Sequence, residues 1–327
     1  MEKDKVSVIL PIYNQEPYLR NSIPAVLNQS YENLEVICVN DGSTDNSKAI
    51  IDDFAKADPR VKVINRHNGG LSAAIITGVE RATGDFVCFL DPDDFIGNRF
   101  IETFINEIED FDFVSAGYYS NINGVDFENR ISQPSSYCEN EIQELRNIFL
   151  FDRRTGSLSS KIFVSRWNKM YRMDCLKAVI EEYKVCCSVS LGEDTIFTYL
   201  LLCHSHKGKT LATINSYHYR IGSQTSMMSN GSIDKHLEKA KEAKRVFDYI
   251  LGKHGDDQQH SLFLYYYLVE SLRQRLKKNS EDIDVKYLEM LMKKDVDYQK
   301  ALNCLIKQTQ GLKKVRFIAK KYSLFLV

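Results

Sequence analysis

Three carboxylates stand together directly after a short apolar run. Residues 86–90 read FVCFL, and Asp91, Asp93 and Asp94 follow with only Pro92 among them. Carboxylates this close repel one another unless a positive charge lies between them. Mn²⁺ and Mg²⁺ prefer oxygen ligands, and phosphate oxygens often complete their coordination. A polar turn with helix-capping aspartates would account for the same residues, but their place after a buried run favours a metal site.

Three further apolar runs also end in polar residues. Residues 6–10 (VSVIL) are followed by Pro11, Tyr13 and Asn14, and residues 34–39 (LEVICV) by Asn40 and Asp41. Residues 61–64 (VKVI) are followed by NRHNGG, which contains Asn68 and Gly69. Tyr13 either offers a flat face on which a base stacks or packs in a loop. Asp41 could accept an N–H of a base, although the residues after it also suit a capped turn before a helix.

The paired glycines after Asn68 resemble a turn that binds phosphate at a helix N-terminus. They form neither a GxGxxG nor a Walker sequence. Both sequences carry a defined phosphate-binding mechanism, so their absence argues against a dehydrogenase and against a P-loop ATPase.

The first hundred residues predict a scaffold that brings these polar clusters together. Apolar residues at helical spacing over 16–29, 45–57 and 71–82 alternate with the four apolar runs. Buried strands that alternate with helices predict a parallel sheet covered on both faces. Right-handed crossovers then place the carboxyl ends of these strands at one edge, which is where open parallel sheets bind ligands.

The rest of the chain predicts an appended helical region. Strands are expected over 111–119, 165–172 and 210–220, and helices over 139–151, 174–183, from 192, and over 233–251, 260–276 and 283–308. Strand signals stop near residue 225. The expected fold is therefore α/β, with a parallel-rich central sheet flanked by helices in a domain at 1–225, followed by a helical C-terminal region at 226–327.

The last segment, 311–327, is basic and amphipathic. It carries five Lys and Arg residues and no acid, and its apolar residues recur at helical spacing. Such a segment suits an anionic membrane surface. A terminal helix packed on the domain or on a second subunit of a homo-oligomer fits equally well, so both interpretations stay open.

The overall composition excludes several classes of function. Forty-three Lys and Arg against forty-four Asp and Glu leave a net charge of −1, which argues against broad nucleic-acid binding. The eight cysteines show no CxxC spacing, so we expect buried free thiols and no zinc or redox motif. The N-terminus does not resemble a signal peptide, and no run approaches the length of a membrane span. We expect a cytoplasmic protein, peripheral at the inner face of the membrane if the basic segment binds lipid.

Taken in order, the motifs resemble those of family-2 glycosyltransferases, which have the A-type nucleotide-sugar fold. The matching pieces are VSVILPIYN (6–14), LEVICVNDGSTDNS (34–47), NGGLSAA (68–74), ATGDFVCFLDPDD (82–94), WNKMYR (167–172), GEDTIF (192–197) and YHYR (217–220). The resemblance implies inverting transfer of a sugar from a nucleotide sugar, first of all a UDP-sugar, with Mn²⁺ or Mg²⁺ as cofactor.

The resemblance also implies a role for each matching residue. The donor site would comprise Pro11, Tyr13, Asn14, Asp41, Asn68, Gly69, Asp91 and Arg220. Within it, Tyr13 stacks on the base, Asp41 accepts from the base edge, Asp91 holds the ribose and Arg220 closes over the diphosphate. Asp93 would ligate the metal, and Asp94 would orient the sugar or a metal-bound water.

On the acceptor side the resemblance implies a general base. Asp194 matches that residue and Glu193 is its neighbour, although on spacing alone both acids suit the first turn of a helix. Trp167, Asn168 and Lys169 are expected to line the sugar or acceptor side.

One position departs from the family pattern. Many relatives carry Arg-Asn where this chain has Ile75-Ile76. That Arg usually helps to hold the donor, so its absence leaves the nucleotide open and admits a non-catalytic subunit with an assembly role. A nucleotidyltransferase is a further alternative, but residues 11–18 (PIYNQEPY) offer no Lys or Arg to grip a triphosphate. A glycan, a lipid-linked and a protein-linked acceptor all remain open.

Overall fold

The computed structural model describes residues 4–131, 133–150, 163–221, 232–279 and 282–309. By its internal contacts the chain divides into two compact units. The first comprises Met1–Glu144, Ser160–Ser188 and Phe197–Ser229, and the second comprises Leu145–Ser159, Val189–Ile196 and Asn230–Val327. The sequence-based boundary near residue 225 stays a prediction.

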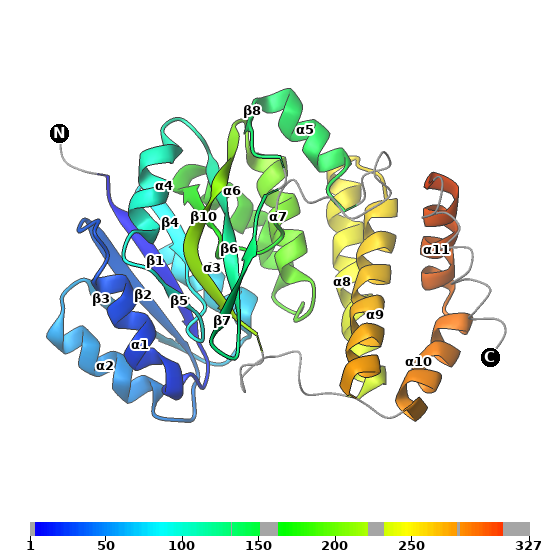
Figure 1. The fold of residues 1–327 in the computed structure, drawn as a ribbon, viewed down its shortest axis with the longest axis horizontal. Coiled ribbons are helices and arrows are strands. Elements are labelled where there is room, and N and C mark those ends of the chain that lie inside the picture. Colours follow the sequence, from blue (N-terminus) through cyan, green and yellow to red (C-terminus); the bar gives the residue numbers. More distant parts are fainter. Residues whose placement is uncertain (1–3, 132, 151–162, 222–231, 280–281, 310–327) are drawn as a thin grey trace. The chain divides into compact units, whose positions relative to one another are not determined.

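The first unit is built on one mixed sheet (Figure 1). Its strands are β1 (Val6–Ile12), β2 (Leu34–Asp41), β3 (Val61–Arg66), β4 (Phe86–Phe89), β5 (Phe95–Ile96), β6 (Phe113–Ile122), β7 (Val125–Asn129), β8 (Ser136–Tyr137), β9 (Lys169–Arg172) and β10 (Gly208–Arg220). The strand order is β3-β2-β1-β4-β9-β6-β10-β5, with β7 paired to β6 and β8 to β10. This confirms the α/β fold with a parallel-rich central sheet.

Strand directions bring the predicted polar clusters to one edge of the sheet. β1, β2, β3 and β4 are mutually parallel, and β6 and β10 are parallel to each other. β9 is antiparallel to both β4 and β6, so all six parallel strands point the same way. We call the edge where these six strands end the C-terminal edge.

Helices cover both faces of the parallel part of the sheet. The unit's helices are α1 (Glu16–Leu27), α2 (Ser47–Ala57), α3 (Leu71–Arg81), α4 (Phe100–Ile108) and α6 (Met173–Tyr183), and α5 (Glu139–Asn147) begins in it. Val8 and Leu10 of β1 share a core with apolar residues of α1 and α2. Ile9 faces the other way, toward Gly78 of α3, where a Cβ would lie 2.4 Å from its Cγ2. Side chains alternate across a strand, so this pattern places α3 on the opposite face from α1 and α2.

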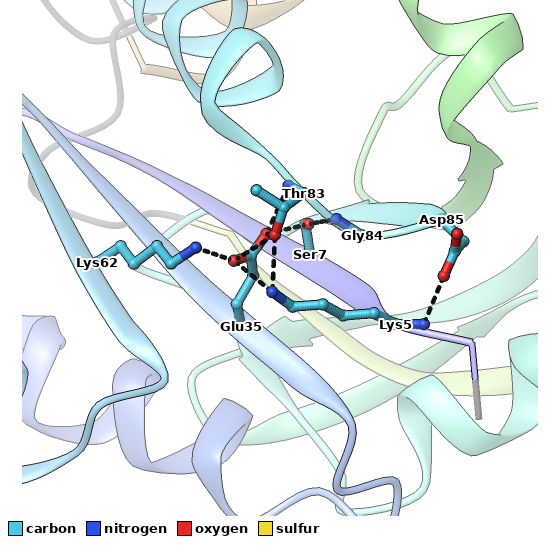
Figure 2. A network of polar contacts seen from close by, with 7 residues as sticks. All are labelled: Lys5, Ser7, Glu35, Lys62, Thr83, Gly84 and Asp85. Atoms are coloured by element: carbon cyan, nitrogen blue, oxygen red, sulfur yellow. Dashed lines mark hydrogen bonds and ion pairs between the residues drawn. The ribbon is translucent and has the colours of Figure 1, made fainter. Parts of the chain in front are cut away.

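A polar network ties the opposite edge together (Figure 2). The side chain of Glu35, at the start of β2, is 2% exposed and accepts bonds from Lys5 and Lys62. It also accepts from the Ser7 hydroxyl at 2.7 Å and from the Thr83 backbone N–H at 2.7 Å. One carboxylate thus joins β1, β2, β3 and the loop before β4.

The second unit holds the C-terminal helices α8 (Ile233–His254), α9 (Gln259–Asn279), α10 (Asp282–Lys294) and α11 (Val296–Gln308). The single helix expected over 283–308 is wrong, because Asp295 is extended (φ −76°, ψ 114°) and its side chain accepts from Tyr298 N–H as an N-cap of α11. Across the described ranges no helix combines the length and the apolar character needed to cross a bilayer. The basic segment 311–327 lies outside the described residues.

Candidate active site

The loops after β1 and β2 are locked together by side-chain hydrogen bonds. Asn14 N–H donates to Ser43 Oγ at 3.0 Å, and its Oδ1 accepts from Thr44 N–H at 2.8 Å. Asn14 has φ 53°, a left-handed conformation that Asn tolerates better than most residues. Asn14 is thus used to hold the two loops. Beside it, Pro11 is buried within β1 and Tyr13 is 47% exposed, as a stacking surface for a base requires.

Asp41, at the end of β2, has partners on every side. Its Oδ1 accepts from Arg66 Nη1 at 2.8 Å and from Gly69 N–H at 3.0 Å. Its Oδ2 accepts from Gly70 N–H at 2.8 Å. These amides directly precede α3 (Leu71–Arg81), so the positive end of that helix faces a carboxylate of the same chain. Asp41 is only 3% exposed, and these donors satisfy both of its carboxylate oxygens.

The cluster changes how the glycine turn is interpreted. The N–H groups of Gly69 and Gly70, expected to cradle phosphate, donate to Asp41 instead. The guanidinium of Arg66 packs so closely against the turn that a Cβ at Gly69 would lie 2.6 Å from Arg66 Nη2. A phosphate could bind these N–H groups only by displacing the Asp41 carboxylate. A base N–H that donates to Asp41 would have to share that carboxylate with them. Asn68 is exposed beside the turn.

The acidic turn is held by the end of β10. Asp94 N–H donates to Asp91 carbonyl oxygen at 3.0 Å, which closes the turn. Asp94 is 3% exposed, and its Oδ2 accepts from the Tyr217 hydroxyl at 2.7 Å. Its Oδ1 accepts from Arg220 N–H at 2.7 Å. Asp91 and Asp93 are half-buried.

Electrostatics at this turn favour an added positive charge. Burial raises the pKa of Asp94 well above its ordinary value, and the charges of Asp91 and Asp93 raise it further. Arg220 supplies one positive charge: its Nε donates to Asp93 carbonyl oxygen at 2.8 Å, and its guanidinium carbon lies 5.5 Å from the ring centroid of Tyr18. The structure therefore brings Arg220 to the acidic turn.

Trp167, Asn168 and Lys169, expected on the sugar side, are buried within the first unit. They are 6%, 1% and 0% exposed. Lys169 Nζ donates to Phe163 carbonyl oxygen at 2.6 Å, to Ser165 carbonyl oxygen, and to Asn168 Oδ1 at 2.9 Å. These three acceptors match the three protons of an ammonium group. Lys169 thus holds the chain before β9, and a contact of this motif with sugar stays a prediction.

Glu193 and Asp194 belong to the second unit, where α7 (Glu193–His204) begins. Gly192, with φ 80°, makes the turn into this helix, and its carbonyl accepts from Thr195 N–H at 3.1 Å. Two acids in a first turn are stabilised by the helix dipole. The helix start is confirmed, and the role of Asp194 as a base stays a prediction.

Two positions of the site were missed by the sequence analysis. Arg66 stands opposite Asp41 in the parallel register of β2 and β3, a pairing that only the register reveals. Tyr217 was noticed within YHYR without a role of its own. The sequence signal that could have identified Tyr217 was its place three residues before Arg220, on a strand with alternating apolar positions.

Comparison with known proteins decides the family. The family model described as glycosyl transferase family 2 matches residues 7–180. The chain belongs to glycosyltransferase family 2. It is 30% identical over 326 residues to glycosyltransferase GlyA of Streptococcus pneumoniae, covering 98% of this chain and 44% of that one. It is 32% identical over 224 residues to the putative glycosyltransferase EpsH of Bacillus subtilis, covering 68% and 62%.

Solved structures support the same fold. TarS of S. aureus, residues 1–349 in complex with UDP, superposes with a TM-score of 0.60 at 18% identity, covering 98% of this chain and 89% of that one. A likeness at this identity establishes the architecture. This family-2 chain spans less than half the length of GlyA, so its own activity and substrates are inferred below.

Proposed function

We propose that this family-2 chain is a metal-dependent, inverting glycosyltransferase that moves a sugar from a UDP-sugar to a hydroxyl of its acceptor. The observation that carries the proposal is the acidic turn at the C-terminal edge, where two half-buried carboxylates, Asp91 and Asp93, lie beside Arg220. The choice of UDP draws on TarS, which has been solved with UDP and with UDP-GlcNAc.

The residues of the turn fit a divalent cation. Asp94 uses both oxygens within the chain, so the proposal assigns the metal to its neighbour Asp93 and the ribose to Asp91. Mg²⁺-like ions commonly take one or two carboxylates and complete their shell with phosphate and water. Asp93 would hold Mn²⁺ or Mg²⁺, and the bound ion would neutralise charge on the departing diphosphate.

The chain's own residues supply the remaining steps. Tyr13 and Asp41 bind the base, Asp91 holds the ribose, and Arg220 places its guanidinium against the diphosphate. Asp194 takes the proton of the acceptor hydroxyl as its oxygen forms the new bond to the anomeric carbon and the bond to the diphosphate breaks. Attack opposite the leaving group inverts the configuration. The transition state has oxocarbenium character.

A nucleotide-release assay tests this proposal. UDP release from a panel of UDP-sugars is expected with Mn²⁺ and not with chelator. Asp93→Asn should abolish release and remove Mn²⁺-dependent UDP binding in calorimetry, because it removes the metal ligand. Asp52→Asn, which changes a carboxylate of α2 whose side chain is 33% exposed, is the matched control and should behave as wild type. Wild-type protein that binds UDP-sugar yet never releases UDP would favour the non-catalytic assembly role.

The acceptor side of the proposal includes a membrane surface. We infer from its sequence that the segment 311–327 binds anionic lipid, which would suit a lipid-linked glycan acceptor, with each basic residue contributing about 1 kcal/mol. Full-length protein should sediment with anionic vesicles at low salt, and protein ending at residue 310 should not. Equal sedimentation of the two proteins, or none by either, would assign the segment to packing or to a homo-oligomer.

A further inference from the structure

We propose that Tyr217 is a positioning residue that sets the metal affinity of the acidic turn, acting through Asp94. This inference rests on the proposed function, since it takes Asp93 of the acidic turn as the carboxylate that would hold a metal. It gives Asp94 a different role from the expected one: Asp94 holds the turn together through its own hydrogen bonds and orients neither sugar nor water.

One hydroxyl contacts both ends of the turn. The Tyr217 hydroxyl donates to Asp94 Oδ2 at 2.7 Å, and its oxygen accepts from the N–H of Asp91 at 3.3 Å. The N–H of Asp94 closes the turn on the carbonyl of Asp91. The backbone between Asp91 and Asp94, which carries Asp93, is therefore fixed at both ends by a single side chain.

The strand beyond the turn is fixed to the same segment of β10. β5 follows Asp94 directly and pairs antiparallel with β10, with Phe95 opposite His218 and Ile96 opposite Tyr217. Arg220 N–H donates to the second oxygen of Asp94. Any displacement of Tyr217 would thus move the exit of the turn as well as its buried carboxyl.

Tyr217 is itself held rigidly. Its side chain is 0% exposed, and the ring of Trp167 stacks on it with centroids 4.2 Å apart and planes 13° apart. Phe100 contacts it with a centroid separation of 5.8 Å. This stack gives the buried Trp167 a role: its ring packs against the ring of Tyr217 and supports it.

Removal of the hydroxyl should loosen the turn without changing any residue that faces a ligand. Asp94 would lose one of its two partners while buried, and the N–H of Asp91 would lose its acceptor. Residues that orient metal ligands through hydrogen bonds typically affect metal affinity by about 10–100-fold when they are changed. We expect a loss in that range for Tyr217→Phe.

The experiment measures Mn²⁺ binding without turnover. Free Mn²⁺ is followed by electron paramagnetic resonance as the ion is titrated into full-length protein at a fixed UDP concentration, and the same UDP solution without protein corrects for Mn²⁺ bound by free UDP. The matched control is Tyr183→Phe, which also deletes one hydroxyl from a fully buried tyrosine, there bonded to Ser72 Oγ at 3.0 Å. Tyr217→Phe should raise the Mn²⁺ dissociation constant about 10–100-fold, and Tyr183→Phe should leave it within twofold of wild type, at a temperature where melting curves show both folded.

A second variant keeps the test decisive if Tyr217→Phe does not fold. Asp94→Asn preserves shape and should weaken Mn²⁺ binding to a similar extent, whereas a direct ligand would be expected to abolish it. Equal Mn²⁺ affinities of Tyr217→Phe and Tyr183→Phe would overturn the positioning role and leave the proposed function standing. If wild-type protein takes up no Mn²⁺ with UDP, metal dependence itself fails, and this inference fails with it.

Discussion

The Glu35 network offers the sharpest link between one side chain and stability. Burial acts to raise the pKa of Glu35, but hydrogen bonds from Lys62, Ser7, Lys5 and Thr83 outweigh it and lower the pKa from 4.5 to about 2. Because one pKa unit corresponds to about 1.4 kcal/mol, the charged form is worth at most about 3 kcal/mol to the folded state. Lys5 and Lys62 are 32% and 45% exposed, and water screens such partners. We therefore expect Glu35→Gln to destabilise by about 2 kcal/mol at pH 7.

The pH dependence has a definite sign. A carboxyl whose folded pKa is lowered stabilises the protein above its unfolded pKa, and this contribution is lost as pH falls from about 4.5 toward 2. The stability difference between wild type and Glu35→Gln should accordingly be full at pH 6 to 7 and shrink at pH 3.

Urea unfolding followed by Trp167 fluorescence measures this difference, because Trp167 is the only tryptophan and lies in the same unit as Glu35. Asp52→Asn is the control, since its partner Lys48 is 54% exposed and such surface pairs contribute about 0–1 kcal/mol. A Glu35→Gln loss no larger than that of the control, or one that is the same at pH 7 and pH 3, would refute the reasoning.

Two further predictions concern the site itself. Asp194→Asn should lower kcat by about 10²–10⁴-fold with UDP-sugar affinity unchanged, because a general base acts on the acceptor; lost UDP binding with turnover retained would point instead to a role at the start of α7. Gly69→Ala should lower the melting temperature and weaken UDP binding in calorimetry, because the new Cβ displaces the Arg66 guanidinium from the buried Asp41; unaltered UDP affinity would separate Arg66 from donor binding.

Sequence patterns predicted the parallel part of the sheet well because its strands are continuous apolar runs. The predicted strands ended before β2 and β3 do in the structure. Asn40 and Asp41 continue the ladder opposite Asn65 and Arg66, with Asn40 Nδ2 donating to Asn65 Oδ1 at 2.9 Å. Polar residues normally end a strand in a sequence-based prediction, but cross-strand polar pairs can stabilise a sheet. β5 and β8 were missed because two residues carry no periodicity.

The candidate site was predictable as a set of positions and less so as a set of contacts. The acidic turn was expected at the ligand edge from its place after a strand, and Arg220 was expected there from the family resemblance; the two lie together. The partners of Asp41 and Lys169 were not predictable, because each depends on backbone groups brought close by the tertiary fold. Sequence spacing indicates which residue types stand at an edge, and burial decides which of them face inward.

The distribution of charge at the C-terminal edge bears on the order of binding. The charge of Asp41 is balanced by Arg66 and by the two amides just before α3, so this carboxylate adds little repulsion to an incoming nucleotide. The acidic turn is different, because Asp91 and Asp93 are half-buried and Arg220 supplies one positive charge beside them. A diphosphate that arrives without a cation therefore meets like charge at short range. We expect UDP to bind weakly without Mn²⁺. On the same argument, Asp93→Asn should bind metal-free UDP as well as wild type or more tightly while losing the Mn²⁺-dependent gain. Weaker metal-free binding by this variant would mean that Asp93 contacts the nucleotide directly.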